Sequence, residues 1–170
     1  VRKQFDSDIT EEAIAMIEAN DALRTSKSTV LFKNSWHKGV IGIVAARCVE
    51  KFYRPTVILT ESNNKITGSA RSVNGFDLYH AILECSDLLE KFGGHKYAAG
   101  LTLDISNLEL FQRRFEEVVS STITEDMLTP VLEMDMPLHF DLITTKFLTI
   151  LKQMAPFGPE NQRPLFEASG

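Results

Sequence analysis

The sequence predicts an α/β domain, in which a mixed β-sheet is flanked by helices, followed by the start of a second, β-rich module. Short runs of β-branched residues alternate with stretches that carry an apolar stripe at helical spacing, in the order α-β-α-β-β-α-β-α. Hydrophobic residues make up 44% of the 170 residues, which is enough for a sizeable core. Near Leu128 the composition changes, and this change marks the second module.

The first half of the domain contains two predicted helices and three predicted strands. In order, they are a helix over 8–24, a strand over 28–33, a helix over 40–53, and strands over 55–60 and 65–72. Thr10 can cap the first helix, and Glu11 and Glu12 suit the positive end of its dipole. Pro55 stops the second helix.

The second half begins with a helix that Asp77 can cap. Its apolar stripe consists of Leu78, Ile82, Cys85, Leu89 and Phe92. Gly93 then stands where a helix C-cap glycine belongs. A strand over 98–104 and an amphipathic helix over 107–123 complete the domain, and the second module should contain a strand over 129–138, a helix over 144–154 and a Pro/Gly-rich loop that leads into another strand.

The net charge of −5 argues by itself against a nucleic-acid partner. The charge is unevenly distributed, however. Residues 33–54 contain five cations and one acid, whereas residues 104–141 contain nine acids and two arginines. A basic region in an acidic body can attract a polyanion to one face, and a mixed, solvated surface is the alternative that charge alone leaves open.

Both cysteines, Cys48 and Cys85, fall on apolar stripes, so we expect buried free thiols and a reducing, cytoplasmic setting. There is no CxxC motif and the four histidines are far apart, which argues against a zinc site. No apolar run approaches the ~18 residues that a membrane span needs. Because the chain begins with Val1 and ends within a predicted strand, we expect it to be a piece of a longer protein.

The first candidate site segment is "SWHKGVIGI", residues 35–43, where a strand ends and a helix begins. Free N–H groups at the start of a helix, together with its dipole, can bind an anion. Lys38 adds a mobile charge there, Trp36 offers a stacking face, and His37 and Gly39 complete the segment. The alternative is an ordinary helix start with a half-buried Trp anchor.

The second candidate segment is "TGSARS", residues 67–72. Gly68 and Ala70 would leave room for a ligand. The hydrogen-bond donors that could hold phosphate oxygens are Ser69, Arg71 and Ser72. The alternative is a strand of small residues packed under a helix, with Arg71 in an ion pair.

The third candidate segment is "KFGGHKYAAGLTLD", residues 91–104. Gly93 is explained by the predicted helix end, but Gly94 is not, and a glycine pair can turn consecutive N–H groups toward one anion. His95 and Lys96 add donor side chains at the same spot, and the small residues at 98–100 would let a ligand lie across the following strand. The alternative is a generous turn. Since no cluster has metal-ligand spacing, the chain could hold phosphate but lacks the means to cut it.

These segments resemble a known family. "SWHKGVIGIVAARCVEKFYRPTVIL", "GSARSVNGFDLYHAI" and "KFGGHKYAAGLTL" are similar to the DHH-associated domain of the RecJ single-stranded-DNA-specific exonucleases. The GGHxxAAG pattern alone marks DHH phosphoesterases broadly, and "LKQMAPFGPENQRPLF" narrows the match because it resembles the entrance to the OB-type domain of RecJ. The resemblance implies a connector helix region over 1–27, a DHH-associated substrate-binding domain over 28–127, and the beginning of a truncated, β-rich OB-like domain over 128–170.

The resemblance implies the substrate-binding part of a 5′-to-3′ single-stranded-DNA exonuclease that acts in DNA recombination and repair. Its Mn²⁺ or Mg²⁺ would be bound by a catalytic domain that this chain lacks, so we expect no metal here and no activity from this chain alone. The implied partners are single-stranded DNA and other repair proteins, with no membrane, in the cytoplasm.

The resemblance also implies roles for individual residues. His95 would be catalytic and, with the backbone of Gly93 and Gly94, would meet the scissile region. The residues implied to hold the terminal phosphate are Ser69, Arg71 and Ser72, and those implied to line the path are His37 and Lys38. Two alternatives share parts of this pattern: a DHH-type phosphoesterase for short oligonucleotides or cyclic dinucleotides, and a non-catalytic RNA-binding module like the related domain of alanyl-tRNA synthetases.

Overall fold

The computed structural model describes residues 2–158 and 160–169. Val1, in the predicted connector region, and Pro159 and Gly170, in the predicted OB-like module, lie outside the described residues. The chain divides into two units, one that ends at Pro130 and one that begins at Val131.

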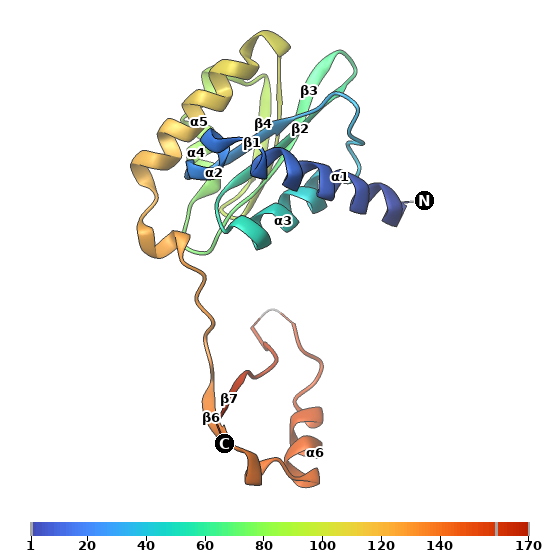
Figure 1. Ribbon diagram of the computed structural model, residues 1–170, viewed down its shortest axis with the longest axis vertical. Helices are drawn as coiled ribbons and strands as arrows, with labels where there is room; N and C mark the ends of the chain where they lie inside the picture. The colour runs from blue at the N-terminus through green and yellow to red at the C-terminus, as the bar shows by residue number, and fades with distance from the viewer. Residues whose placement is uncertain (1, 159, 170) are drawn as a thin grey trace. The chain divides into compact units, whose positions relative to one another are not determined.

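The first unit is built on a β-sheet (Figure 1). Its five strands have the order β1-β2-β3-β5-β4. The strands are β1 Thr29–Phe32, β2 Thr56–Ser62, β3 Lys65–Arg71, β4 Lys91–His95 and β5 Ala98–Leu103. β1 and β2 are parallel and are joined through a helix, whereas all other neighbours are antiparallel. The predicted mixed sheet is therefore confirmed.

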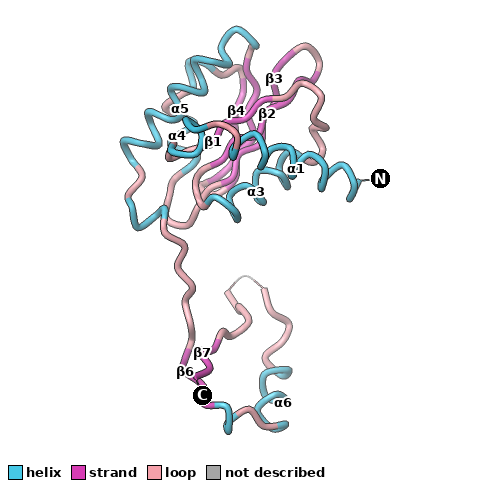
Figure 2. The backbone as a smooth tube through the Cα atoms, viewed as in Figure 1, coloured by secondary structure: helices cyan, strands magenta, loops and turns pink. Residues whose placement is uncertain are grey.

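Helices cover both faces of this sheet (Figure 2). α1 (Arg2–Glu18) and α3 (Ile41–Phe52) lie on one face, and α4 (Leu78–Leu83) and α5 (Leu108–Thr122) lie on the other. The short α2 (Asp21–Thr25) follows α1 and is capped by the side chain of Asn20. The core consists of two clusters of buried apolar side chains, one on each face, because successive side chains of a strand point in opposite directions.

The alternation of side chains is most informative along β3. Ile66, Gly68 and Ala70 are buried, and the residues between them are half-buried. Ile66 and Ala70 belong to the cluster under α4 and α5. β3 therefore gives one set of residues to the core and the other set, which includes Ser69 and Arg71, to the face beside α3.

The helix predicted after Asp77 is shorter than expected. The Asp77 carboxylate accepts a hydrogen bond from the His80 N–H (2.9 Å), as predicted, but α4 ends at Leu83. A 3₁₀ turn (Ser86–Leu88) follows, and the predicted helix end becomes β4, so Gly93 is a strand residue and no C-cap. Pairing with β5 satisfies backbone groups that a longer helix would have bonded internally.

The predicted cap of the first helix is also wrong. α1 extends from Arg2, and Thr10 lies within it, buried against α3. Asp6 of α1 forms an ion pair with Arg47 of α3 (2.7 Å between Oδ2 and Nη2), and the Thr10 hydroxyl is 3.5 Å from Nη1 of the same arginine. Thr10 therefore helps to hold α1 on α3.

The described residues of the second unit form two short strands, one α-helix and a 3₁₀ turn (Phe140–Leu142). β6 (Met136–His139) and β7 (Phe166–Ser169) are parallel, and α6 (Thr145–Gln153) lies between them in the sequence. The hydroxyl of Thr144 caps α6 by accepting a hydrogen bond from the Phe147 N–H (3.2 Å). The predicted helix and final strand are confirmed, but the strand predicted over 129–138 begins only at Met136.

Cys48 and Cys85 are fully buried and unpaired with each other, as expected. Burial raises the pKa of each thiol to about 11, so both are protonated at neutral pH. Over residues 2–158 and 160–169, no helix has both the length and the apolar character needed to cross a membrane.

Candidate nucleic-acid interface

The second and third candidate segments meet on the face of the sheet beside α3. Residues directly opposite one another in antiparallel strands share a face. Two of the rows that cross β3, β5 and β4 are Ser69–Gly100–Gly93 and Arg71–Ala98–His95. Ser69 thus shares a row with Gly93, and Arg71 shares a row with His95, although each pair is 24 positions apart in the sequence.

Apart from Ser69, Arg71 and His95, these rows consist of two glycines and one alanine. A Cβ added at Gly93 would meet no atom within 4 Å, and one added at Gly100 would meet only the Gly68 carbonyl oxygen at 3.8 Å. Gly93 and Gly100 are exposed, and Ala98 between the strands is half-buried. We call Gly93, Ala98 and Gly100 the bare strip, because a ligand can lie there directly against the backbone.

The first candidate segment completes the site, because the amino end of α3 lies across a groove from β3. The amino end of α3 forms one wall of a groove of about 540 Å³, the α3–β3 groove. The groove is lined by Lys38, Gly39, Ile41, Gly42, Ile43, Thr67, Gly68, Ser69 and Arg71. No side chain caps α3 at Val40, so no capping side chain occupies the amino end of the helix, where an anion could accept hydrogen bonds from its first N–H groups.

Arg71 is held by its own strand and not by an acid. Its Nη1 donates hydrogen bonds to Ser69 Oγ (3.0 Å) and to the Ala70 carbonyl (2.8 Å). Among the described residues, no carboxylate pairs with Arg71. The alternative of a structural ion pair is therefore absent from this part of the chain, and the guanidinium keeps its charge for a ligand.

Trp36 does not offer the expected stacking face. Only 4% of the residue is exposed, and its Nε1–H donates to Glu12 Oε2 of α1 (2.7 Å). Lys33 pairs with the other oxygen of the same carboxylate. The hydrogen bond from Lys33, and then that from Trp36, lowers the pKa of Glu12. Trp36 is thus an anchor between the loop and α1, because an indole ring is buried most favourably with its N–H bonded.

Three residues of "TGSARS" also differ from expectation. A Cβ at Gly68 would lie 2.4 Å from Leu59 and 3.2 Å from Leu101, so this glycine makes room for core side chains. Ala70 faces the same core and leaves no room for a ligand. The Ser72 hydroxyl donates to the Phe76 carbonyl (3.2 Å) and so shapes the following loop. The side chains that this segment presents to the groove are those of Thr67, Ser69 and Arg71.

The two candidate histidines share a local arrangement. His37 Nδ1 accepts a hydrogen bond from the Gly39 N–H (3.0 Å), and His95 Nδ1 accepts one from the Tyr97 N–H (3.3 Å). In a neutral imidazole this leaves the proton on Nε2, which becomes a donor directed away from the backbone. Both rings are exposed, His95 at the end of the Arg71 row.

The two candidate lysines are exposed. The Lys96 ammonium lies 5.6 Å from the ring centroid of Tyr97 in the β4–β5 turn, and Lys38 lines the groove.

Gly42 is a further residue of the groove, which sequence reasoning missed. Its signal was available, because a glycine in the first turn of a predicted helix lowers helix propensity and calls for a packing reason.

A family model described as the DHHA1 domain matches residues 25–121, more than half of the chain. The chain belongs to the DHHA1 family. Residues 134–170, beyond the DHHA1 domain, match the model described as the RecJ OB domain.

Relatives of known name extend over nearly the whole chain. The single-stranded-DNA-specific exonuclease RecJ of Bacillus subtilis (strain 168) is 38% identical over 165 residues, which cover 96% of this chain and 21% of that protein. RecJ of Escherichia coli (strain K12) is 31% identical over 176 residues, covering 98% of this chain and 30% of that protein. The chain with its DHHA1 domain thus spans only a fifth to a third of the length of these relatives.

A solved structure has a similar fold. The crystal structure of RecJ in complex with Mn²⁺ from Thermus thermophilus matches with a TM-score of 0.82 and 26% identity, covering 97% of this chain and 24% of that chain. The corresponding complex with Mg²⁺ matches with a TM-score of 0.81. The resemblance to RecJ found in the sequence is therefore confirmed.

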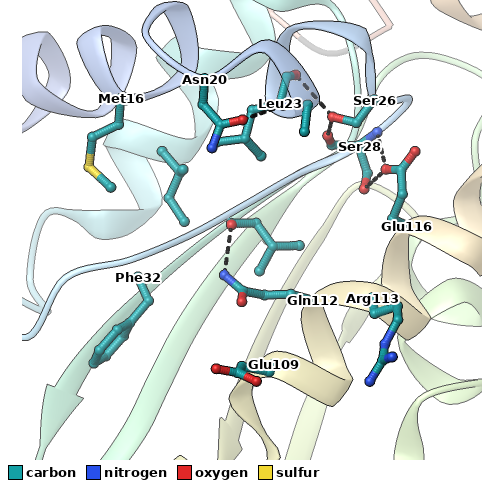
Figure 3. A pocket seen from close by; sticks show the side chains of 13 residues that line it. Met16, Asn20, Leu23, Ser26, Ser28, Phe32, Glu109, Gln112, Arg113 and Glu116 are labelled. Atoms are coloured by element: carbon teal, nitrogen blue, oxygen red, sulfur yellow. Dashed lines mark hydrogen bonds between the residues drawn. The ribbon is translucent and has the colours of Figure 1, made fainter.

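A second cavity of the DHHA1 domain, of about 490 Å³, lies away from the bare strip, between α2, β1 and α5 (Figure 3). Two of its polar side chains bind the backbone at the free edge of β1 and just before it. The Gln112 side chain donates to the Val30 carbonyl (3.2 Å). Glu116 accepts hydrogen bonds from the N–H groups of Lys27 (2.9 Å) and Ser28 (2.8 Å), as Figure 3 shows for Ser28. These side chains of α5 replace a neighbouring strand, so the cavity is explained by folding.

Glu116→Ala is expected to destabilise the DHHA1 domain by about 2–3 kcal/mol, because two backbone N–H groups lose a charged acceptor. Urea unfolding followed by circular dichroism measures the change. Glu117→Ala is the matched control, since Glu117 is exposed on the same helix and should change stability by less than about 0.5 kcal/mol. Equal unfolding midpoints for the two variants would show that the hydrogen bonds of Glu116 do not stabilise the fold.

Proposed function

We propose that this chain is the substrate-binding part of a 5′-to-3′ single-stranded-DNA exonuclease and holds the DNA phosphates against a metal-dependent catalytic domain outside the chain. The observation that carries the proposal is the grouping of Arg71, Ser69 and the amino end of α3 around one groove beside the bare strip. The names of the relatives support this substrate, and their greater length leaves room for a catalytic domain.

The groove has the chemistry that a phosphate needs. Guanidinium N–H groups, the Ser69 hydroxyl and helix N–H groups all donate hydrogen bonds, and the bonds that a charged guanidinium makes to phosphate are among the strongest in proteins. Lys38 adds a charge at the groove wall. From there a strand of DNA would continue over the bare strip toward His95, in the row that Arg71 begins. This half of the enzyme would position the phosphate and neutralise part of its charge.

The chain itself does not fit a catalytic metal. Among the described residues, no group of three or more His, Cys, Asp or Glu side chains could hold a metal ion. The related crystal structures contain Mg²⁺ or Mn²⁺. We therefore propose that the full-length enzyme binds Mn²⁺ or Mg²⁺ outside this chain and that this chain alone does not hydrolyse DNA.

The setting proposed for the enzyme is DNA recombination and repair in the cytoplasm, together with other repair proteins. Two buried free thiols suit a reducing compartment. The match of residues 134–170 to the RecJ OB domain favours an exonuclease over a phosphoesterase for short oligonucleotides or cyclic dinucleotides, because those smaller enzymes usually end after the DHH-associated domain.

Arg71→Ala tests the proposal directly. The 170-residue chain should bind a single-stranded oligodeoxynucleotide more tightly with a 5′-phosphate than with a 5′-hydroxyl, and more weakly as salt rises. Loss of a charge-assisted hydrogen bond costs about 1.5–3 kcal/mol, so the variant should bind the phosphorylated strand about 10- to 100-fold more weakly. In the full-length enzyme the same change should mainly raise KM.

Fluorescence anisotropy with the two oligonucleotides measures this difference. Arg114→Ala is the control, because Arg114 lies on α5, over the opposite face of the sheet, and is 3.4 Å from an oxygen of Asp87. Equal affinity of the wild-type chain for both strands would refute the proposed phosphate site, and so would an Arg71→Ala variant that keeps the preference.

A further inference from the structure

Gly42 occupies a position where the backbone does not require glycine. It lies in the first turn of α3, and its φ angle is outside the left-handed range that other residues avoid. Alanine would favour the helix more than glycine does. The reason for glycine at this position must therefore be sought in its surroundings.

The surroundings of Gly42 are the two donors of the α3–β3 groove. A Cβ built on Gly42 would lie 2.9 Å from Arg71 Nη2, 3.6 Å from Arg71 Cζ and 3.1 Å from Ser69 Oγ. Real Cβ atoms essentially never approach another heavy atom below 3.0 Å. The guanidinium therefore lies against the bare backbone of the helix, in the space that a side chain would fill.

We propose that Gly42 is a positioning residue for Arg71. Its missing side chain lets the guanidinium lie beside both Ser69 and the first N–H groups of α3, so that all three donors can reach one phosphate. The inference rests on the proposed function. It adds to the site a residue that acts through the position of Arg71, because glycine has no side chain of its own to bind phosphate. Because Nη1 is bonded to Ser69 and Ala70, Nη2 is the part of the guanidinium that an added methyl group would displace.

A larger residue at position 42 should weaken phosphate binding without destabilising the fold. The atoms nearest to the added Cβ belong to the ends of two side chains, which can move aside without moving the backbone. Gly68 is the contrasting case in the same groove, since its Cβ would meet Leu59 and Leu101 in the core. A loss of phosphate recognition in a stably folded protein is therefore the signature of positioning at Gly42.

The test is a double-mutant cycle with Gly42→Ala and Arg71→Ala in the 170-residue chain. Gly42→Ala should keep or raise the melting temperature. It should weaken binding of the 5′-phosphorylated strand by about tenfold, the scale of one hydrogen bond, and leave the 5′-hydroxyl strand unaffected. In the Arg71→Ala background, Gly42→Ala should have no further effect, because its action passes through the arginine. Gly158→Ala, which adds the same methyl group in open space in the other unit, should change none of these values.

The outcomes separate this inference from the proposed function. A wild-type chain without preference for the 5′-phosphate would overturn both. A clear preference that Arg71→Ala removes but Gly42→Ala leaves intact would overturn only the role of Gly42, as would additive effects in the cycle. The Arg71 side-chain Nε–H resonance in ¹⁵N-resolved NMR gives a readout without ligand: it should shift in Gly42→Ala and not in Gly158→Ala, and an unmoved signal would also overturn the role.

Discussion

His95→Ala is expected to lower kcat about 100-fold or more in a full-length exonuclease that carries this chain, with a smaller effect on KM. This is the scale on which removal of one donor to the transition state acts. His95 ends the row that begins at Arg71, and its Nδ1 accepts the Tyr97 N–H, so Nε2–H is available as a donor. A donor placed where charge rearranges during the reaction stabilises the transition state more than the bound substrate.

His95→Gln separates a donor from a proton acceptor, because a glutamine amide can donate in place of Nε2–H but cannot take up a proton. We expect the Gln variant to retain kcat within about tenfold of wild type, because its amide N–H replaces the Nε2–H donor. His80→Ala, on the opposite side of the sheet, should leave kcat unchanged. If His95→Ala turns over DNA at the wild-type rate, the histidine has no part in the reaction. If the Gln variant is as slow as the Ala variant, His95 acts by proton transfer and not as a hydrogen-bond donor.

Gly94→Ala is expected to destabilise the first unit by about 3–5 kcal/mol, which combines strained backbone with a steric clash. Gly94 has a φ angle of 151°, and a Cβ there would lie 2.3 Å from the Ala98 carbonyl oxygen and 2.5 Å from Ala99 Cα. These are backbone atoms of the paired strand, so neither can move without breaking the β4–β5 ladder. The melting temperature and the urea midpoint should both fall.

Gly93→Ala provides an internal comparison one residue away. Gly93 has an ordinary φ angle and open space around its would-be Cβ, so the same methyl group should change stability by less than about 1 kcal/mol. Similar melting temperatures for the two variants would contradict the geometry of the β4–β5 hairpin. From the sequence, Gly93 was assigned to a helix C-cap and no local role was found for Gly94. Of these two positions, the structure requires glycine only at Gly94.

Elements with a strong pattern of their own could be predicted from the sequence. The β-branched runs became β1 and β2, and the stripes of α3 and α5 are buried as expected. β4 could not be predicted in this way, because two glycines argue against a strand and only pairing with β5 makes one. The stripe from Leu78 to Phe92 suggested a helix, since its residues do face the core, but periodicity does not reveal where one element gives way to the next.

For the candidate site, the sequence identified the segments but not the direction of their side chains. Small residues at Gly68 and Gly100 look alike in sequence, yet one makes room for the core and the other leaves the sheet bare. The difference depends on strand register, which fixes the face of every residue at once. Trp36 was misjudged for a similar reason, because its partner Glu12 lies on a helix 24 residues earlier.

The contact between Trp36 and Glu12 attaches the N-terminal helix α1 to the loop that carries Lys38. Trp36 is two residues before Lys38, and Lys33 pairs with the same carboxylate, so the start and the middle of the loop that leads into α3 are tied to α1. If α1 tilts, the loop is pulled with it and the position of the Lys38 charge over the groove changes. In the proposed DNA site, phosphate binding would therefore depend on the orientation of a helix that lines no part of the groove.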